Sequence, residues 1–165
     1  MKRFDTRSRA WLLLIAATAA VFCAGIIFAP MLEDQGVSAG SWLRLAYRPT
    51  CHQMPDRSLD LGCGPLAVCA RCSGLYAGGM IALLCGALFG IRVRPRLIWV
   101  IVAVTPSALD FGLALAGLPH LSNWPRFLVA IPPGLLLGLL LADAIADIVS
   151  HVGPTQRPSG TDPLQ

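Results

Sequence analysis

The run GLYAGGMIALLCGALFGI, residues 74–91, contains no charged side chain. Its length approaches the roughly 20 residues that a helix needs to cross the hydrocarbon core of a bilayer. In lipid the backbone must satisfy its own hydrogen bonds, and a helix does so within one segment. The run therefore predicts a membrane-spanning helix. Small residues recur at every fourth position of it, at Gly74, Gly78, Ala82, Gly86 and Gly90.

Three further apolar runs of similar length cover residues 10–29, 97–118 and 127–149. Together the four runs predict an all-α fold, a four-transmembrane-helix bundle with a structured loop, residues 30–73, between the first two spans. Small residues spaced by four let two helix backbones approach closely, so we expect the spans over 74–91 and 127–149 to share a close contact. The last run has this spacing at Ala130, Gly134, Gly138, Ala142 and Ala146.

The composition excludes an ordinary soluble domain. Of the 165 residues, 55% are hydrophobic and 13% are charged, and the mean hydropathy is +0.65; soluble domains have about a quarter of their residues charged. The net charge of +4 is modest and sits in short clusters between apolar runs, so we expect no nucleic-acid binding. We interpret residues 1–152 as a single membrane domain and the Pro/Ser/Thr-rich residues 153–165 as a disordered tail.

The first run also invites interpretation as a cleaved signal peptide, since residues 37–39 resemble a cleavage site. Its apolar core is longer than the roughly 7–15 residues usual for a signal sequence, so we interpret it as a retained span.

Basic residues predict the orientation. The tight connection that carries Arg92, Arg94 and Arg96 is typical of the cytoplasmic side, so both termini are expected in the cytoplasm and residues 30–73 outside it. The Lys and Arg residues on the expected inner side are Lys2, Arg3, Arg7, Arg9, Arg92, Arg94, Arg96 and Arg157. Those on the expected outer side are Arg44, Arg48, Arg57, Arg71 and Arg126.

The loop concentrates reactive side chains in two short motifs, CHQMPDRS at 51–58 and CARC at 69–72. The C-x-x-C spacing lets two thiolates hold one ion, and a neighbouring Cys-His pair completes the tetrahedral sulfur and nitrogen set that zinc prefers. The first interpretation is therefore a zinc-like site formed by Cys51, His52, Cys69 and Cys72.

Upstream in the same loop, residues 41–47 predict a short helix lying in the membrane interface, ended by Pro49.

The second interpretation is thiol–disulfide chemistry. Cys69 and Cys72 precede the expected helix at 74–91, whose N-terminus and neighbouring Arg71 favour thiolate over thiol. Cys51 and Cys63 are candidates for a loop disulfide that exchanges with this pair. Membrane disulfide-forming enzymes use such an arrangement and pass electrons to a quinone, an analogy of architecture alone.

The third interpretation gives the cysteines a structural role only. An outward-facing loop in an oxidising compartment uses disulfides to fix its shape, and four cysteines allow three connectivities. In that case the arginines carry the function, and the protein handles a lipid or another anionic molecule at the membrane.

The two motifs, with an Asp in the span over 97–118 and S-N-x-x-R after it, resemble the family of small prokaryotic membrane proteins designated domain of unknown function 2085. The resemblance covers roughly residues 48–138. It implies a location in the cytoplasmic membrane of a prokaryote and no particular activity. The family pattern has no cysteine at the position of Cys63, which weakens the redox relay and favours metal binding. The matching residues are Cys51, His52, Gln53, Pro55, Arg57, Ser58, Cys69, Ala70, Arg71, Cys72, Ser73, Gly74, Tyr76, Asp110, Gly112, Ser122, Asn123 and Arg126.

Charged residues inside spans predict two further contacts. Asp110 lies within the third run, where a carboxylate is costly and needs a partner, and Arg71 and Arg126 border the ends of neighbouring spans. Asp143 and Asp147 share one helix face and are expected to pair with Arg92, Arg94 or Arg96. The residues expected to surround the Cys/His cluster and to bind a cofactor or an anionic group are Arg57, Arg71, Asp110, Asn123 and Arg126.

Overall fold

The computed structural model of the protein describes residues 4–90, 92, 95–119 and 121–152. The expected tail at 153–165 and four of the basic residues, Lys2, Arg3, Arg94 and Arg157, lie outside the described residues. Within the described part, four helices are long and apolar enough to cross a membrane, which confirms the all-α, four-span fold. These helices are α1 (Thr6–Asp34), α3 (Ala70–Phe89), α4 (Leu97–Leu115) and α5 (Asn123–Val152).

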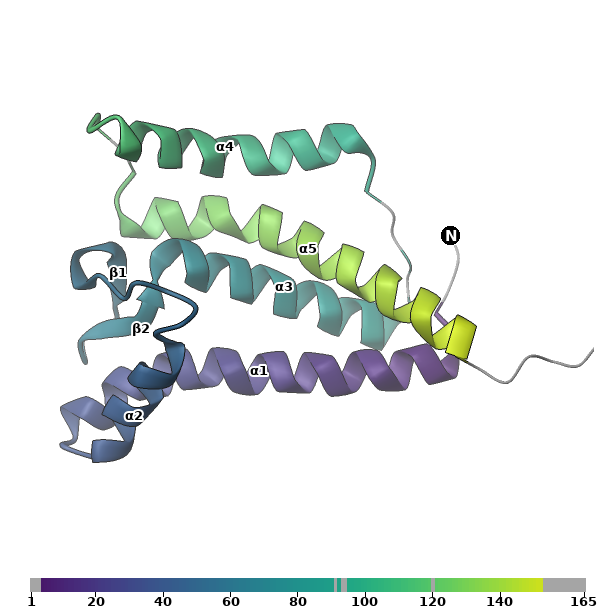
Figure 1. Cartoon of the computed structure of the whole chain (residues 1–165), viewed down its shortest axis with the longest axis horizontal. Coiled ribbons are helices and arrows are strands. Elements are labelled where there is room, and N and C mark those ends of the chain that lie inside the picture. Colours follow the sequence, from purple (N-terminus) through teal and green to yellow (C-terminus); the bar gives the residue numbers. More distant parts are fainter. Residues whose placement is uncertain (1–3, 91, 93–94, 120, 153–165) are drawn as a thin grey trace, which may run out of the picture.

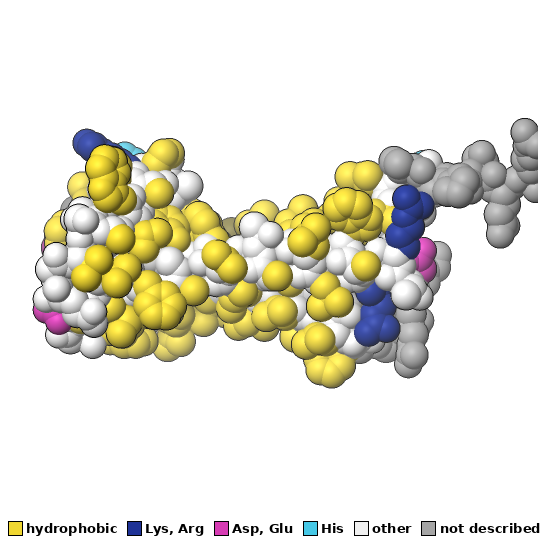
Figure 2. All heavy atoms as spheres, turned by 90° about the horizontal axis from the view of Figure 1, so that it is seen from below, with side chains coloured by type: hydrophobic (Ala, Val, Ile, Leu, Met, Phe, Trp, Pro, Cys, Tyr) yellow, Lys and Arg dark blue, Asp and Glu magenta, His cyan; other side chains and the backbone are white. Residues whose placement is uncertain are grey.

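The four long helices run roughly along one axis (Figure 1). Helices α1, α3 and α5 lie beside one another, and α4 lies on the far side of α5. The elements between α1 and α3 gather at one end of the bundle, hereafter the loop end, and the start of α1 and the end of α5 lie at the opposite end. Figure 2 shows apolar side chains along the whole length, with charged side chains towards the two ends, as expected for a protein that spans a membrane.

The small-residue strips of α3 and α5 face each other, which confirms the contact expected between these two helices. A Cβ atom added to Gly78 would lie 2.3 Å from the carbonyl oxygen of Ile131. One added to Gly134 would lie 2.4 Å from the carbonyl oxygen of Leu75. The backbones therefore touch directly, because only glycine leaves room for such an approach.

The helix ends differ from the ends of the apolar runs. Helix α1 continues through the buried Pro30 to Asp34, and α3 and α5 begin four residues before the apolar runs do, at Ala70 and Asn123. Hydropathy marks the part of a helix that suits lipid, whereas hydrogen bonding continues into polar residues at the membrane surface.

The loop end contains a second layer of structure. Helix α2 (Ser38–Tyr47) begins three residues before the expected helix and packs against the second half of α1. There the Tyr47 hydroxyl donates to the carbonyl oxygen of Phe22 at 2.7 Å. A short helix, η1 (Pro55–Arg57), then leads into β1 (Ser58–Asp60), which pairs antiparallel with β2 (Pro65–Cys69). The hairpin was not expected from the sequence.

Ion pairs and hydrogen bonds join the helices at the opposite end of the bundle. Arg92 pairs with both Asp143 and Asp147, which confirms the pairing expected for these two carboxylates. Arg9 donates to the carbonyl oxygens of Ala87 and Leu88 at 2.9 and 2.8 Å, and so satisfies the last turn of α3.

Candidate functional site

Three of the predicted ligands form a cluster at the loop end. The sulfur atoms of Cys51, Cys69 and Cys72 all lie within 4.8 Å of one another. Cys51 is buried, at 8% exposure, and the other two are half-buried. None of the three is in a disulfide, so the structure presents them as a group of three thiols.

Two segments of the chain bring these thiols together, the one after α2 and the junction of β2 with α3. Cys51 follows the end of α2, where its N–H donates to the carbonyl oxygen of Tyr47 at 3.2 Å. Cys69 is the last residue of β2 and the N-cap of α3, and Cys72 lies in the first turn of that helix. The backbone N–H of Cys69 donates to the sulfur of Cys51 at 3.2 Å. Such a donor stabilises a thiolate, and this kind of support is common around metal-binding cysteines.

Gln53 fixes the chain next to Cys51 and was not among the predicted site residues. Its backbone adopts a left-handed conformation, with φ of 54°, which is uncommon outside glycine. Its amide donates to the carbonyl oxygens of Arg44 at 2.6 Å and Ala67 at 2.8 Å, one from α2 and one from β2. The side chain therefore ties the two elements that flank the thiols. The motif C-H-Q contained this signal, but spacing alone gave it no role.

The first thiol of the C-x-x-C pair is acidified. A hydrogen bond from the Cys72 thiol lowers the pKa of Cys69 to about 5, against the opposing effect of burial. Backbone N–H donors of the first turn act in the same direction, as expected at a helix N-terminus. The lowered pKa favours the thiolate form of Cys69, the form that binds metals and attacks disulfides.

The structure does not bring His52 or Cys63 into the cluster. His52 is exposed, and its ring nitrogens lie outside the group of ligand atoms within 4.8 Å of one another. Cys63 lies in the turn of the hairpin, between Gly62 and Gly64, both with positive φ. Cys51 thus has Cys69 and Cys72 as its sulfur neighbours, and not Cys63.

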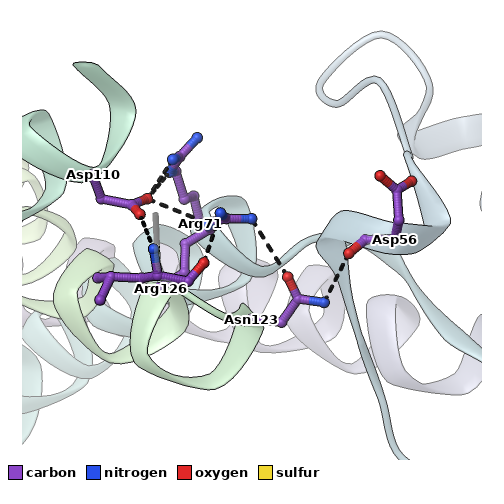
Figure 3. A network of polar contacts seen from close by, with 6 residues as sticks. Asp56, Arg71, Asp110, Asn123 and Arg126 are labelled. Carbon is purple, nitrogen blue, oxygen red and sulfur yellow. Dashed lines mark hydrogen bonds and ion pairs between the residues drawn. The ribbon is translucent and has the colours of Figure 1, made fainter. Parts of the chain in front are cut away.

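Arg71, which lies between Cys69 and Cys72 in the sequence, belongs to a buried ion network (Figure 3). Asp110 is 2% exposed, and its Oδ2 accepts hydrogen bonds from Arg71 Nε at 2.9 Å and Arg126 Nε at 3.2 Å. Its Oδ1 accepts from the N–H of Leu121 at 2.8 Å. The guanidinium of Arg71 also lies 5.4 Å from the ring centroid of Phe111. Both arginines named from the sequence as partners of Asp110 therefore contact it.

Asn123 connects the network to the loop. Its Nδ2 donates to the carbonyl oxygens of Asp56 at 3.1 Å and Ser58 at 2.9 Å, and its Oδ1 accepts from Arg126 (Figure 3). The N-terminus of α5 is thereby joined to η1 and β1. Asn123 acts as a structural link between the helices and the loop, rather than as a group facing a ligand.

The thiols and the arginines line one pocket of about 390 Å³. Cys51, Cys69 and Cys72 contribute sulfur atoms to it, and His52 contributes to the lining. The cations around it are Arg57, Arg71 and Arg126. Apart from Cys63, Asp110 and Asn123, the predicted site residues line this pocket together.

Fold and site together define a small polytopic helical membrane protein with a pocket lined by thiols and arginines at one end. The family model described as "Predicted membrane protein (DUF2085)" matches residues 51–140. The chain belongs to this family.

Two archaeal relatives support that assignment. An uncharacterised protein of Methanocaldococcus jannaschii is 30% identical over 132 residues, which cover 74% of this chain and 84% of the relative. An uncharacterised protein of Methanothermobacter thermautotrophicus is 25% identical over 109 residues, covering 66% of this chain and 97% of the relative. No solved structure matches this chain.

Proposed function

We propose that the protein binds a zinc-like metal ion at the mouth of the helix bundle, through Cys51, Cys69 and Cys72. The mutual approach of the three sulfur atoms to within 4.8 Å carries this proposal, because Cys51 comes from a segment 18 residues before Cys69 and meets the C-x-x-C pair only through the fold. Tetrahedral zinc with Zn–S bonds of about 2.3 Å holds its sulfur ligands about 3.8 Å apart. A shift of about 1 Å suffices to bring the sulfurs to that spacing.

The surrounding groups suit a metal-bound thiolate. The N–H of Cys69 supports the sulfur of Cys51, and the carbonyl contacts of Gln53 hold the flanking backbone in place. His52 lines the same pocket and is the proposed fourth protein ligand, which requires movement of its exposed side chain. When three protein ligands bind zinc, the fourth position is open to water or substrate, and the ion then acts as a Lewis acid.

Metal analysis beside thiol counting tests the proposal. Protein purified under reducing, chelator-free conditions is expected to contain one equivalent of zinc. The single variants Cys51→Ser, Cys69→Ser and Cys72→Ser are expected to lose it. Cys63→Ser is the matched control and is expected to keep the metal, because Cys63 lies outside the cluster. Wild-type protein without stoichiometric metal, or a Cys69→Ser variant that retains it, contradicts the proposal.

The second candidate is a membrane thiol–disulfide oxidoreductase, supported by the acidified thiol of Cys69 at a helix N-terminus. In that function Cys69 and Cys72 form a disulfide by giving two electrons and two protons to an oxidant, a quinone that leaves as quinol. Cys72→Ser then leaves mixed disulfides on Cys69 unresolved and detectable on non-reducing gels. Acid trapping that finds both thiols reduced in growing cells, with zinc bound, rejects this alternative.

We place the pocket on the extracytoplasmic side, with both termini in the cytoplasm. The basic cluster around Arg92 supports this orientation. The start of α1 and the end of α5 also lie together, opposite the loop end (Figure 1). A third candidate keeps the arginines as the functional groups, with the cysteines pairing as structural disulfides. It predicts loss of folding, and not of metal, when a paired cysteine is removed.

A further inference from the structure

The pocket wall beside the thiols has more positive than negative charge. Arg57, Arg71 and Arg126 all line it, and Asp110 is the carboxylate in contact with two of them. Within the described part of the chain, the Arg57 side chain makes no ion pair or hydrogen bond. Arg71 directs two of its N–H groups at Asp110 and has others left for a ligand.

A bound zinc ion does not remove the excess of positive charge around the pocket. The three guanidiniums and one carboxylate leave two positive charges. A zinc ion held by three thiolates carries one negative charge, so one positive charge remains around the pocket. Arg57 is exposed, but Arg71 is half-buried and Arg126 is buried, and unbalanced charge is costly at such positions. An anionic ligand in the pocket supplies the compensating charge.

Guanidinium groups are well suited to one kind of anion. The planar fork of arginine N–H groups matches the oxygens of phosphate in a bidentate geometry. Phe111 lies under the Arg71 guanidinium and holds it in the pocket wall. The volume of about 390 Å³ falls within the range of small-molecule sites, and it exceeds what an isolated phosphate fills.

We propose that this pocket binds a phosphate group, free or as a monoester, through Arg57 and Arg71 beside the thiol cluster. The inference deepens the proposed function and assigns a ligand class to the same pocket. The pocket geometry carries it, so it is testable with and without metal. The phosphate has two sources, a soluble phosphate compound or the headgroup of an anionic lipid.

Calorimetric titration with inorganic phosphate tests the inference on full-length protein in a phosphate-free detergent. Wild-type protein is expected to bind saturably, and Arg57→Gln to bind about tenfold more weakly, since a hydrogen bond between charged groups is lost. Arg48→Gln is the matched control, because Arg48 is exposed near the same loop but does not line the pocket. Absence of saturable binding by wild type, or equal affinity in the Arg57→Gln variant, overturns the inference.

Two further measurements distinguish a failure of the phosphate inference from a failure of the metal-binding proposal. The titration is repeated on chelator-treated, reduced protein, and zinc content is measured for Arg57→Gln. We expect phosphate binding to persist without metal and zinc to persist in the variant. Zinc binding without phosphate binding overturns the inference alone, and phosphate binding without zinc binding overturns the metal proposal alone.

The source of the phosphate is found with two esters, glycerol 3-phosphate and a short-chain phosphatidic acid. A lipid headgroup is the source if phosphatidic acid binds at least tenfold more tightly than glycerol 3-phosphate, and a soluble compound if it does not. In both cases Arg57→Gln must weaken the better ligand about tenfold. An unchanged affinity for it in this variant contradicts the inference.

Discussion

Asp110 and Arg126 form a buried ion pair that joins α4 to α5, with Arg126 Nε 3.2 Å from Asp110 Oδ2. Asp110 is the one buried residue of α4, whose other side chains are exposed or half-buried. Packing of apolar side chains therefore does little to hold α4 against the bundle. The contacts of Asp110 with Arg71, Arg126 and Leu121 fix the helix at the loop end.

Asp110→Asn is expected to lower stability by about 3–5 kcal/mol, because it leaves two arginines without their shared carboxylate. Asparagine keeps the shape and can still accept from Leu121, so the variant isolates the loss of charge. For a chain of this size, the loss corresponds to a fall of roughly 6–20 °C in the melting temperature in detergent. Asp56→Asn is the control, since Asp56 is an exposed carboxylate at the same end. Equal melting temperatures for the two variants contradict the role given to Asp110.

The close contact between α3 and α5 depends on glycine residues, which have no side chain to hold the two backbones apart. Gly78→Ala places a methyl group against the carbonyl oxygen of Ile131, where the separation of 2.3 Å allows no atom. We expect a loss of about 1–3 kcal/mol, as for an overpacked core, measured by thermal unfolding in detergent. Gly112→Ala provides the matched change on α4, where an added Cβ meets nothing within 4 Å. It should be neutral or slightly stabilising through helix propensity, and a similar loss in both variants argues against the packing explanation.

The fold was predictable because lipid restricts a chain to few structures. The four apolar runs predicted four membrane-spanning helices, and the structure has them. The spacing of residues such as Gly78 and Gly134 predicted the contact between α3 and α5. Asp110 was expected to contact Arg71 or Arg126, since a carboxylate at that depth requires a cation. The structure adds that both arginines share its one Oδ2 atom, which sequence spacing does not determine.

The loop end was predictable only in part, because a segment outside the lipid is not restricted to a few backbone structures. The cluster of Cys51, Cys69 and Cys72 was expected from the motifs, whereas the exposed position of His52 was not. In an irregular segment the order of residues does not fix where adjacent side chains point. The hairpin is too short for an alternating pattern, although Gly62 and Gly64 around its turn were a usable signal.

The lowered pKa of Cys69 predicts how its alkylation depends on pH. Because the folded pKa is about 5, this thiol is largely ionised at pH 6 and loses reactivity only as the pH falls through 5. In urea the same thiol returns to its ordinary pKa of about 8.5 and should react at least tenfold more slowly at pH 6. Mass spectrometry of chelator-treated protein exposed to iodoacetamide measures both rates. A native rate that rises only near pH 8.5 contradicts this prediction, and Cys69→Ser confirms the assignment of the modified peptide.

Cys63 reports which side of the membrane the loop faces. It lies in the hairpin turn, away from the three clustered thiols, and is half-buried. If the loop is extracytoplasmic, a membrane-impermeant maleimide applied to intact spheroplasts should label Cys63. The label is assigned to Cys63 by mass spectrometry, since the thiols of the cluster lie on the same side, and the labelled Cys63 peptide should be missing from Cys63→Ser. Cys85, within the span of α3, is the internal control. Labelling of Cys63 only after the membrane is permeabilised places the loop in the cytoplasm. In a reducing compartment the thiols remain available to a metal, so that result removes the disulfide interpretations and leaves metal binding.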